Sequence, residues 1–449
     1  MSEAKPIRVF QTARDTRDRL TFKGTRRFSG SHADAAARLL ILYPEVVYQT
    51  IEGFGGAFTE AGAVTLQKLS TARRNEILRA YFHPKTGLGY SLCRTHINSC
   101  DFSTGNYAYV EDPADTKLKT FSITRDEAAL IPFIKGAQKV PGANFRMFAS
   151  PWSPPAWMKT NHQMNQGGKL QKKYAAVWAE YYAKYIAAYA KKGIKIWGLT
   201  VQNEPKAVQK WDSCVYSAEE ERNFVRDHLG PVLKKRGLGH VKIMVWDHNK
   251  ERVYGRAKVI LSDPKAAKYV WGVAFHWYSG DHFENLSIMD RMFPGVKLLF
   301  SEGCVEKAAN IGKWENGERY GHHIIGDLNH GAVGWVDWNL LLDEKGGPNH
   351  VGNYCDAPII ADTRKNKILY ESSYYYIGHF SRFIRPGARR IGCSRYTDKL
   401  EAAAFRNRDG SLITVVLNRT DEALAFILRL GHQTSEFTSL PHSMMTLVC

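Results

Sequence analysis

No stretch of the 449-residue chain holds the roughly 18 consecutive apolar residues that a membrane-spanning helix needs. The first ten residues also lack the apolar core, roughly 7 to 15 residues long, of a signal peptide. We therefore expect no integral membrane segment and, for the sequence as it stands, a cytoplasmic location. A secreted or periplasmic protein whose leader had been removed would have the same sequence, so that alternative stays open.

Cysteine is scarce and unpaired in its spacing. The seven cysteines are odd in number and include no Cys-x-x-Cys pair, which argues against both a disulfide framework and a zinc site. We expect reduced thiols and no metal ion or organic cofactor. The positions are Cys93, Cys100, Cys214, Cys304, Cys355, Cys393 and Cys449.

Acidic residues are in the minority: 44 Asp and Glu against 62 Lys and Arg give a net charge of +18. A basic protein can bind nucleic acid, membrane surfaces or acidic polysaccharide. Here the cations are scattered, as in Lys191-Lys192 and Lys234 to Arg236, near predicted helix ends where they complement the helix dipole. No basic run with interleaved aromatic residues is present, so no nucleic-acid partner is expected. The oligomeric state is not determined by these patterns.

Short apolar runs alternate with amphipathic segments along the middle of the chain, which predicts an α/β fold with eight parallel strands closed into a (β/α)8 TIM barrel. Residues 171–192 are typical of one outer helix, with an aromatic stripe facing the core. Capping boxes at Thr124 to Glu127 and Ser217 to Glu220 predict two helix starts. The eight runs are 54–58, 91–97, 145–150, 196–202, 241–246, 270–277, 296–300 and 334–339.

The two ends of the chain differ from its middle. Residues 399–449 consist of short apolar runs separated by turns such as Asn407 to Gly410, which is typical of antiparallel hairpins. The first 50 residues contain similar runs, so we expect one β-sandwich domain formed from both termini. The predicted division is 1–50 and 386–449 for the β-sandwich and 51–385 for the catalytic barrel.

Two glutamates stand at predicted strand ends. Glu204 follows the fourth run in Asn203-Glu204-Pro205, and Glu302 follows the seventh run. Strands 4 and 7 face each other across the mouth of a barrel, so both carboxyls can reach one bond. Glycosidic bond hydrolysis needs such a pair, one protonated and one ionised. A single strand-end glutamate is more often a salt-bridge partner, so the pairing carries the prediction of Glu204 as general acid/base and Glu302 as nucleophile of a retaining glycosidase.

Other polar and aromatic residues cluster at the same predicted face of the barrel, where Arg94, His276 and Trp338 are predicted to end their strands. Arg94 can neutralise and orient Glu302, although a structural ion pair elsewhere is an equally ordinary use of such an arginine. The remaining candidates offer hydroxyl partners or flat apolar faces for a sugar ring. They are Asp101, Trp152, His276, Tyr278 and Trp338.

Seven motifs, in order along the chain, resemble glycoside hydrolase family 30, and within it the glucosylceramidases and their bacterial relatives. The resemblance implies retaining double displacement, with Asn203 as partner of the sugar 2-hydroxyl and Asn353 as a further pocket residue. It places Asp101, Trp152 and Trp338 in the glucose pocket, and Arg94, His276 and Tyr278 around the carboxylates. The motifs are 54–59, 99–103, 150–161, 202–205, 276–278, 301–304 and 335–339 with 346–349.

Two departures from that family pattern concern the leaving group. Val245 to Asn249 is less acidic than in glucosylceramidases, and His350 replaces an aromatic residue. A soluble alkyl, aryl or saccharide aglycone is therefore expected rather than ceramide. A β-xylosidase or β-1,6-glucanase of the same family is the first alternative, although Asp101 and Trp152 favour glucose. A non-catalytic carbohydrate-binding protein is the alternative of another class, and the presence of both glutamates argues against it.

Overall fold

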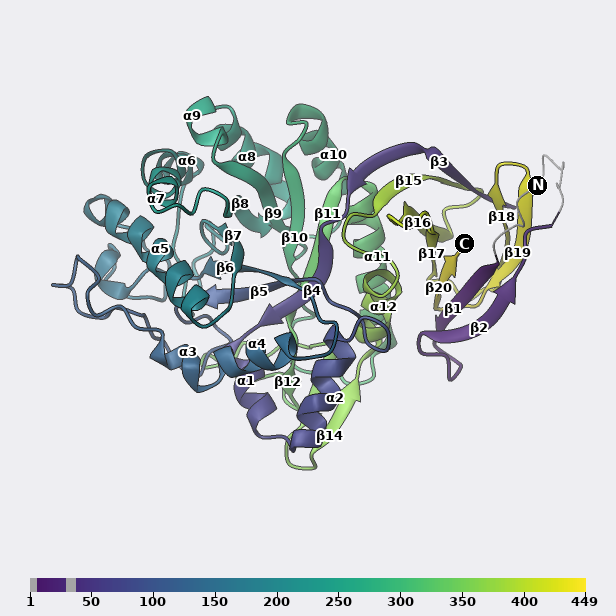
Figure 1. Ribbon diagram of the computed structural model, residues 1–449, viewed down its shortest axis with the longest axis horizontal. Coiled ribbons are helices and arrows are strands. Elements are labelled where there is room, and N and C mark those ends of the chain that lie inside the picture. The colour runs from purple at the N-terminus through teal and green to yellow at the C-terminus, as the bar shows by residue number, and fades with distance from the viewer. Residues whose placement is uncertain (1–5, 30–37) are drawn as a thin grey trace.

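The protein is described by a computed structural model covering residues 6–29 and 38–449, and its larger part is a closed barrel of eight parallel strands (Figure 1). Each of the eight predicted runs forms one strand, and the last strand pairs with the first. The (β/α)8 prediction is thus confirmed. The strands are β4 (Gly53–Phe58), β5 (Leu92–Ile97), β6 (Arg146–Pro151), β7 (Ile196–Thr200), β8 (Lys242–Asn249), β9 (Val270–His276), β10 (Lys297–Glu302) and β11 (Ala332–Asn339).

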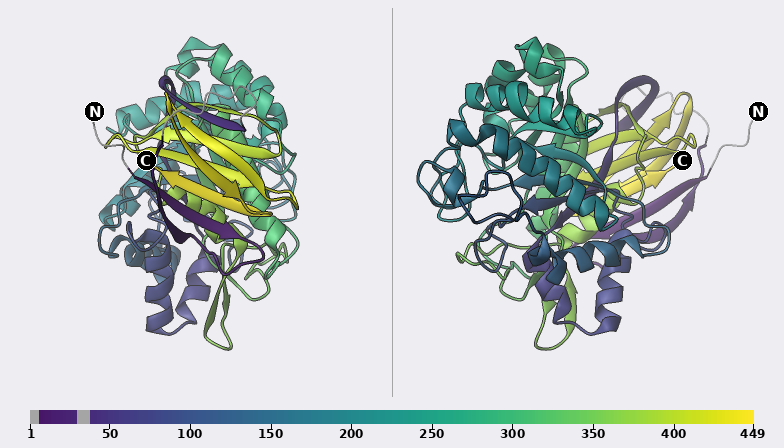
Figure 2. Two further views of the ribbon diagram at one scale, coloured as in Figure 1. Left: turned by 90° about the vertical axis from the view of Figure 1, so that its right-hand side faces the viewer. Right: turned by 60° about the vertical axis from the view of Figure 1, so that its left-hand side comes forward.

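Helices surround the barrel (Figures 1 and 2), and the longer helices bury apolar side chains in the core. In α5 the predicted aromatic stripe is core: Trp178, Tyr181 and Tyr185 are fully buried. The α-helices are α1 (Glu60–Gln67), α2 (Thr71–Phe82), α3 (Thr124–Ala128), α4 (Leu130–Gln138), α5 (Ala175–Lys191), α6 (Ala218–Phe224), α7 (Gly230–Lys235), α8 (Val253–Leu261), α9 (Pro264–Ala267), α10 (Phe283–Met292), α11 (Trp314–Asn329) and α12 (Ser372–Ser381). Short 3-10 and π turns are η1 (Ala156–Met158), η2 (Lys172–Tyr174), η3 (Val225–Leu229) and η4 (Lys250–Arg252).

Both ends of the chain enter one nine-stranded sheet, seen face-on in the left panel of Figure 2. β1 pairs antiparallel with β20, so the first and last strands lie side by side, as predicted for a β-sandwich built from both termini. The strands are β1 (Ile7–Ala13), β2 (Thr21–Arg26), β3 (Leu39–Thr50), β15 (Arg389–Arg395), β16 (Leu400–Arg406), β17 (Leu412–Asn418), β18 (Leu424–Leu430), β19 (Gln433–Ser439) and β20 (Ser443–Val448). A small separate sheet holds β12 (Leu342–Asp343), β13 (Ile359–Asp362) and β14 (Lys367–Tyr370).

The inside of the barrel is filled by side chains that six of its strands contribute. This packing closes the barrel below the mouth and leaves the carboxyl ends of the strands as the place where a ligand can bind. The apolar cluster consists of Leu92, Phe148, Met244, Ala274, Leu299 and Val336, all fully buried.

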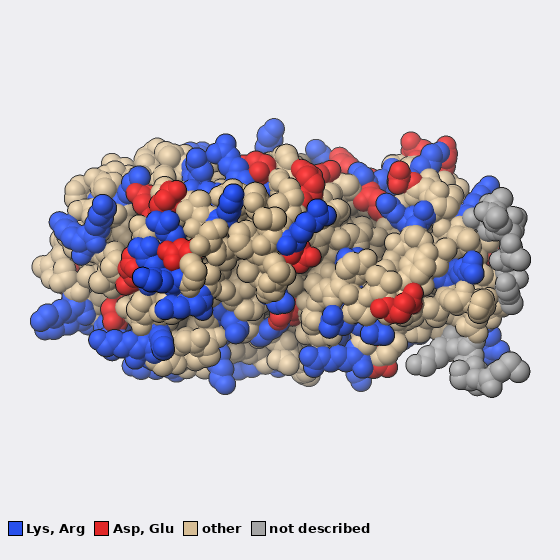
Figure 3. Space-filling view, turned by 90° about the horizontal axis from the view of Figure 1, so that it is seen from above, with Lys and Arg blue, Asp and Glu red and all other residues tan. Residues whose placement is uncertain are grey.

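The surface seen from above carries Lys and Arg over its whole extent, with Asp and Glu interspersed (Figure 3). The basic excess is therefore distributed on this face, as the scattered cations in the sequence predict. Among the helices of residues 6–29 and 38–449, none is long and apolar enough to cross a membrane.

Candidate active site

The two glutamates reach one pocket by different routes. Glu302 is the last residue of β10, whereas Glu204 lies four residues beyond β7 with a left-handed backbone, φ 48°. Such a conformation is strained for a residue other than glycine and persists where neighbours hold it. Here the Glu204 amide donates to the carbonyl oxygen of Asp247 at 2.9 Å. The β8 strand end therefore fixes the position of Glu204.

Both carboxyls converge on one imidazole nitrogen. Nδ1 of His276 lies 3.3 Å from Oε1 of Glu204 and 4.0 Å from Oε1 of Glu302. Because both oxygens lie so close to the same nitrogen, the two carboxyls can contact a single sugar residue. The structure thus brings together the two carboxyls that the sequence pairs.

Arg94, on β5, is fully buried at the centre of the site. Its Nη1 donates to Oε2 of Glu302 at 2.7 Å, and its Nη2 donates to Asp247 at 2.7 Å and to Oδ1 of Asn203 at 2.9 Å. The Tyr278 hydroxyl donates to the other oxygen of Glu302 at 3.0 Å. Both oxygens of Glu302 are thus hydrogen-bonded, which fixes the carboxylate plane and stabilises its ionised form.

Asp247 is the main site residue that the sequence reasoning missed. Its carboxylate accepts hydrogen bonds from Arg94, from Thr200 and Ser301 at 2.6 Å each, and from His276 at 3.0 Å. Burial acts to raise the pKa of Asp247, but the charge of Arg94 and these hydrogen bonds hold it well below its usual range. The sequence does contain a signal for Asp247, because this residue directly follows the fifth apolar run, just as Glu302 stands close behind the seventh.

The electrostatics of the site couple two histidines to the two glutamates. Burial lowers the pKa of His276, but the charge of Glu302 and the hydrogen bonds to Asp247 and Glu204 raise it to about 9, so this ring is cationic at neutral pH. Burial and the charge of Glu204 raise the pKa of Glu302. Burial acts to raise the pKa of Glu204, but the charges of His248 and His276 outweigh burial and lower this pKa overall. Burial also lowers the pKa of His248.

The predicted sugar-binding residues form the wall of the same pocket. The rings of Trp152 and Trp338 are stacked with centroids 4.9 Å apart, and Asn353 donates to Oδ2 of Asp101 at 3.1 Å. Burial and the charge of Glu302 raise the pKa of Asp101 to about 8. A buried carboxyl beside two indoles suits a sugar, which offers hydroxyl groups at its edge and apolar C–H faces.

All ten predicted residues lie at this site. Eight line a cavity of about 580 Å³, while Arg94 and His276 are buried directly behind its wall. The lining also contains residues that the sequence did not single out individually; Trp211, for example, stands in a long loop with no strand end or periodicity to mark it. The predicted lining residues are Asp101, Trp152, Asn203, Glu204, Tyr278, Glu302, Trp338 and Asn353, and the unpredicted ones include Gln209, Trp211, His248, Lys307, Tyr354 and Cys355.

A (β/α)8 barrel whose mouth holds paired glutamates beside stacked indoles is the arrangement of a glycoside hydrolase. The chain belongs to glycoside hydrolase family 30. Residues 51–384 match the glycosyl hydrolase family 30 TIM-barrel domain, and residues 387–447 match the family's β-sandwich domain.

Similar proteins agree with that membership. Lysosomal acid glucosylceramidase of Mus musculus is 39% identical over 403 residues, covering 86% of this chain and 78% of that protein. An endo-1,6-β-D-glucanase of Neurospora crassa is 30% identical, covering 83% of this chain and 79% of that protein. The crystal structure of SrfJ from Salmonella typhimurium superposes with a TM-score of 0.96 at 40% identity and covers 99% of both chains.

Replacing Arg94 with methionine is expected to destabilise the fold. The substitution removes the guanidinium that pairs with the buried carboxylates of Asp247 and Glu302, and breaking such a buried pair costs about 3–5 kcal/mol. Thermal and urea unfolding should show a lower melting temperature and midpoint. The matched control is Arg252→Met, which removes an exposed ion pair with Glu251 and is expected to change stability by less than about 0.5 kcal/mol. Equal stability of the two variants would contradict the central role of Arg94.

Proposed function

We propose that this family 30 hydrolase is a β-glucosidase similar to glucosylceramidases, with Glu302 as nucleophile and Glu204 as general acid/base. The observation that carries the assignment is the difference between the two carboxyls. Glu302 is held rigidly by Arg94 and Tyr278, as an attacking carboxylate must be. Among the described residues, the polar partners of the Glu204 carboxyl are the imidazoles of His276 and His248, so Glu204 is free to exchange a proton.

In the first step Glu204 donates its proton to the leaving oxygen while Glu302 attacks the anomeric carbon, forming a covalent glycosyl-enzyme. In the second step Glu204 removes a proton from water, which displaces Glu302 and restores the β configuration. The resting site keeps a proton on Nδ1 of His276, 3.3 Å from Glu204. When the bound sugar excludes water, the charged His276–Glu204 pair becomes unfavourable, so the proton moves from Nδ1 of His276 to Glu204. Both groups are then neutral, and Glu204 carries the proton that the first step requires.

The sugar and the leaving group are recognised by different parts of the pocket. Asp101, Trp152 and Asn203 form a compact inner end that suits glucose. The outer rim carries His248, Trp211 and other polar or amphipathic side chains, which favours a soluble alkyl, aryl or saccharide aglycone over a ceramide. A β-1,6-glucan is the second candidate substrate, because an endo-β1,6-glucanase of known structure superposes with a TM-score of 0.89 at 28% identity over 99% of both chains.

The test is the initial rate on nitrophenyl β-D-glucoside, xyloside, galactoside and fucoside, with the Glu302→Gln protein as blank. A clear preference for the glucoside supports the proposal, and parallel digests of a β-1,6-linked glucan and of glucosylceramide micelles then rank the aglycones. Preference for the xyloside would assign a β-xylosidase instead. Activity on the β-1,6-glucan alone would assign an endo-glucanase, and binding without turnover of any substrate would assign a carbohydrate-binding protein.

Asp101→Ala is expected to lower kcat/KM for the glucoside by about 10- to 100-fold, because a hydrogen bond to a charged or strongly polar partner contributes about 1.5–3 kcal/mol. The loss should be smaller for the xyloside if Asp101 serves the part of glucose that xylose lacks. The measurement is kcat/KM for both substrates, with Asp101→Asn as the isosteric companion. An equal loss on both sugars would assign Asp101 to a hydroxyl that they share.

A further inference from the structure

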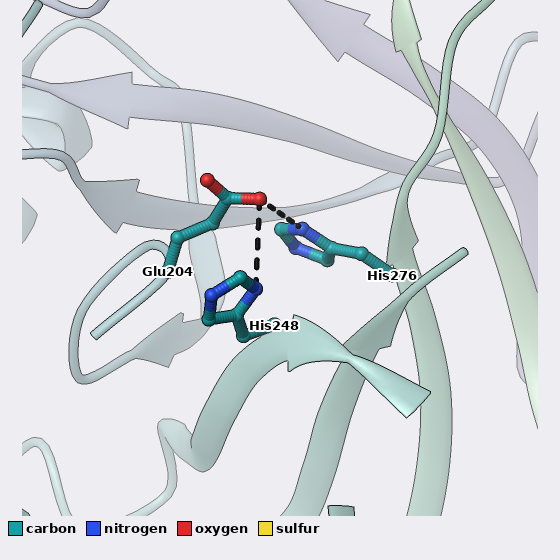
Figure 4. A group of neighbouring side chains, drawn as sticks. All are labelled: Glu204, His248 and His276. Atoms are coloured by element: carbon teal, nitrogen blue, oxygen red, sulfur yellow. Dashed lines mark hydrogen bonds and ion pairs between the residues drawn. The ribbon is translucent and has the colours of Figure 1, made fainter. Parts of the chain in front are cut away.

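Glu204 and His248, which line the pocket, and His276, which lies directly behind its wall, share an unusual geometry (Figure 4). Oε1 of Glu204 lies 3.3 Å from Nδ1 of His276 and 3.6 Å from Nδ1 of His248, and all three atoms lie within 4.8 Å of one another. The first distance is long for a hydrogen bond, and the second is outside hydrogen-bonding range. Among the described residues, Nδ1 of His248 has no hydrogen-bond partner at all, although it is buried.

The two distances that meet at Glu204 are close to the edge length of a tetrahedral metal site. Zinc bound at about 2.0–2.1 Å to nitrogen and oxygen ligands has neighbouring ligand atoms roughly 3.3–3.4 Å apart. The two edges that meet at Glu204 are therefore already close to the coordinated length. Two imidazoles with one glutamate are a known ligand set for zinc, in which water takes the fourth position, whereas magnesium and calcium prefer oxygen ligands alone.

The surroundings also resemble those of a metal site. Nε2 of His276 is hydrogen-bonded to Oδ1 of Asp247 at 3.0 Å, which leaves Nδ1 as the nitrogen directed at the cluster. A carboxylate behind a ligating histidine fixes the ring and strengthens the ligand. The ring of His248 packs against Trp246, with centroids 5.1 Å apart, so it too is held in place.

We propose that Glu204, His248 and His276 form a binding site for a divalent transition-metal ion of the zinc type, and that its occupation blocks hydrolysis. The ion is coordinated by Nδ1 of His276, Nδ1 of His248 and Oε1 of Glu204, and any proton on these atoms is released to solvent. The inhibitory part rests on the proposed role of Glu204, because a coordinated carboxylate cannot protonate a leaving group. The binding part does not depend on any catalytic assignment. The three ligands come from three different strand ends, which is why no spacing in the sequence reveals them.

The experiment is a titration of the chelator-treated full-length protein with Zn²⁺ in competition with a zinc indicator dye. We expect one tight equivalent in the wild type and at least a tenfold weaker dissociation constant in His248→Asn and in Glu204→Gln. His432→Asn, which alters an exposed histidine in the β-sandwich, is the matched control and should bind like the wild type. Mg²⁺ should not compete.

The thiols of Cys304 and Cys355 line the same pocket and are the competing zinc ligands, so Cys355→Ser is the second control. Loss of binding in Cys355→Ser with full binding in His248→Asn would overturn the proposal, as would a wild type that takes up no zinc. If His248→Asn does not fold, the Co²⁺ spectrum of the wild type decides: a tetrahedral spectrum without thiolate charge-transfer bands supports the site, and such bands refute it.

Inhibition is measured separately on the best glycoside substrate. Zn²⁺ should inhibit the wild type with a constant equal to its dissociation constant, and a chelator should restore the rate. Tight binding that leaves the rate unchanged would keep the metal site and contradict the role of Glu204. Inhibition that His248→Asn leaves undiminished would show that zinc acts elsewhere.

Discussion

Glu302→Gln is expected to reduce kcat by on the order of 10⁴-fold or more, because the amide cannot form the glycosyl-enzyme ester on which both steps depend. The amide has the shape of the carboxylate and can keep the hydrogen bond from Arg94, so the loss should come without unfolding. Rates on nitrophenyl β-D-glucoside, with melting curves of both proteins, test this. A variant that retains a tenth of the wild-type rate would show that Glu302 is not the nucleophile.

A smaller substitution sharpens the test. Glu302→Gly leaves a space at the anomeric carbon that a small anion such as azide can fill. Because only one displacement then occurs, azide should restore part of the turnover and give the α-glucosyl azide. The matched control is Glu306→Gly, which removes an exposed glutamate at the rim of the same pocket. Its rate should be close to wild type and insensitive to azide.

The eight barrel strands were predictable because each is a short apolar run, and the structure shifts their ends by only a few residues. The rule that barrel chemistry lies at the carboxyl ends of strands was enough to select Glu302, whereas Arg94, predicted to end its strand, is the third residue of β5. Asp247 also lies near the end of its strand, but the fifth apolar run of the sequence ends one residue earlier, at Trp246. Both Trp246 and Asp247 have positive φ angles, 74° and 50°, and β8 continues to Asn249. An irregular strand end of this kind arises from tertiary contacts, which local sequence does not encode.

Local capping signals were right in one place and wrong in another. Ser217 and Glu220 form the predicted reciprocal capping box at the start of α6. Thr124 was predicted to cap α3, but Ile123 occupies the cap position without a side-chain bond, and the hydroxyl of Thr124 is hydrogen-bonded to that of Ser122 at 2.7 Å. The hydroxyl of Thr124 thus interacts with Ser122 and not with the backbone N–H groups at the start of α3. Such local competition between polar side chains leaves no trace in the Ser/Thr-x-x-Glu pattern.

The position of Glu204 depends on a contact between strands. The left-handed backbone of Glu204 is held by its hydrogen bond to Asp247, about 40 residues farther along the chain. The local sequence Asn203-Glu204-Pro205 does not predict this conformation. Barrel geometry nevertheless predicted that both carboxyls would meet. The fourth and seventh barrel strands, β7 and β10, face each other across the mouth of the barrel. Topology thus placed the residues at one site, whereas their orientations required the three-dimensional contacts.

Glu204→Ala is expected to separate substrates by leaving group. General acid catalysis contributes about 10²- to 10⁴-fold, and its loss matters most where the departing oxygen is a poor leaving group. We expect kcat/KM for alkyl glucosides and disaccharides to fall by about 10³- to 10⁴-fold, and that for dinitrophenyl glucoside by about tenfold or less. A series of aryl glucosides should therefore show a steeper dependence of rate on phenol pKa than in the wild type.

The second step gives an independent check on the same variant. Without Glu204 as general base, water attacks the glycosyl-enzyme slowly, so the intermediate should accumulate on dinitrophenyl glucoside and appear as a burst of phenol. Azide needs no general base and should restore turnover, and because Glu302 is still present, two displacements give the β-glucosyl azide. The α anomer from Glu302→Gly and the β anomer from Glu204→Ala would assign the two carboxyls by product stereochemistry. The same anomer from both variants would contradict the assignment.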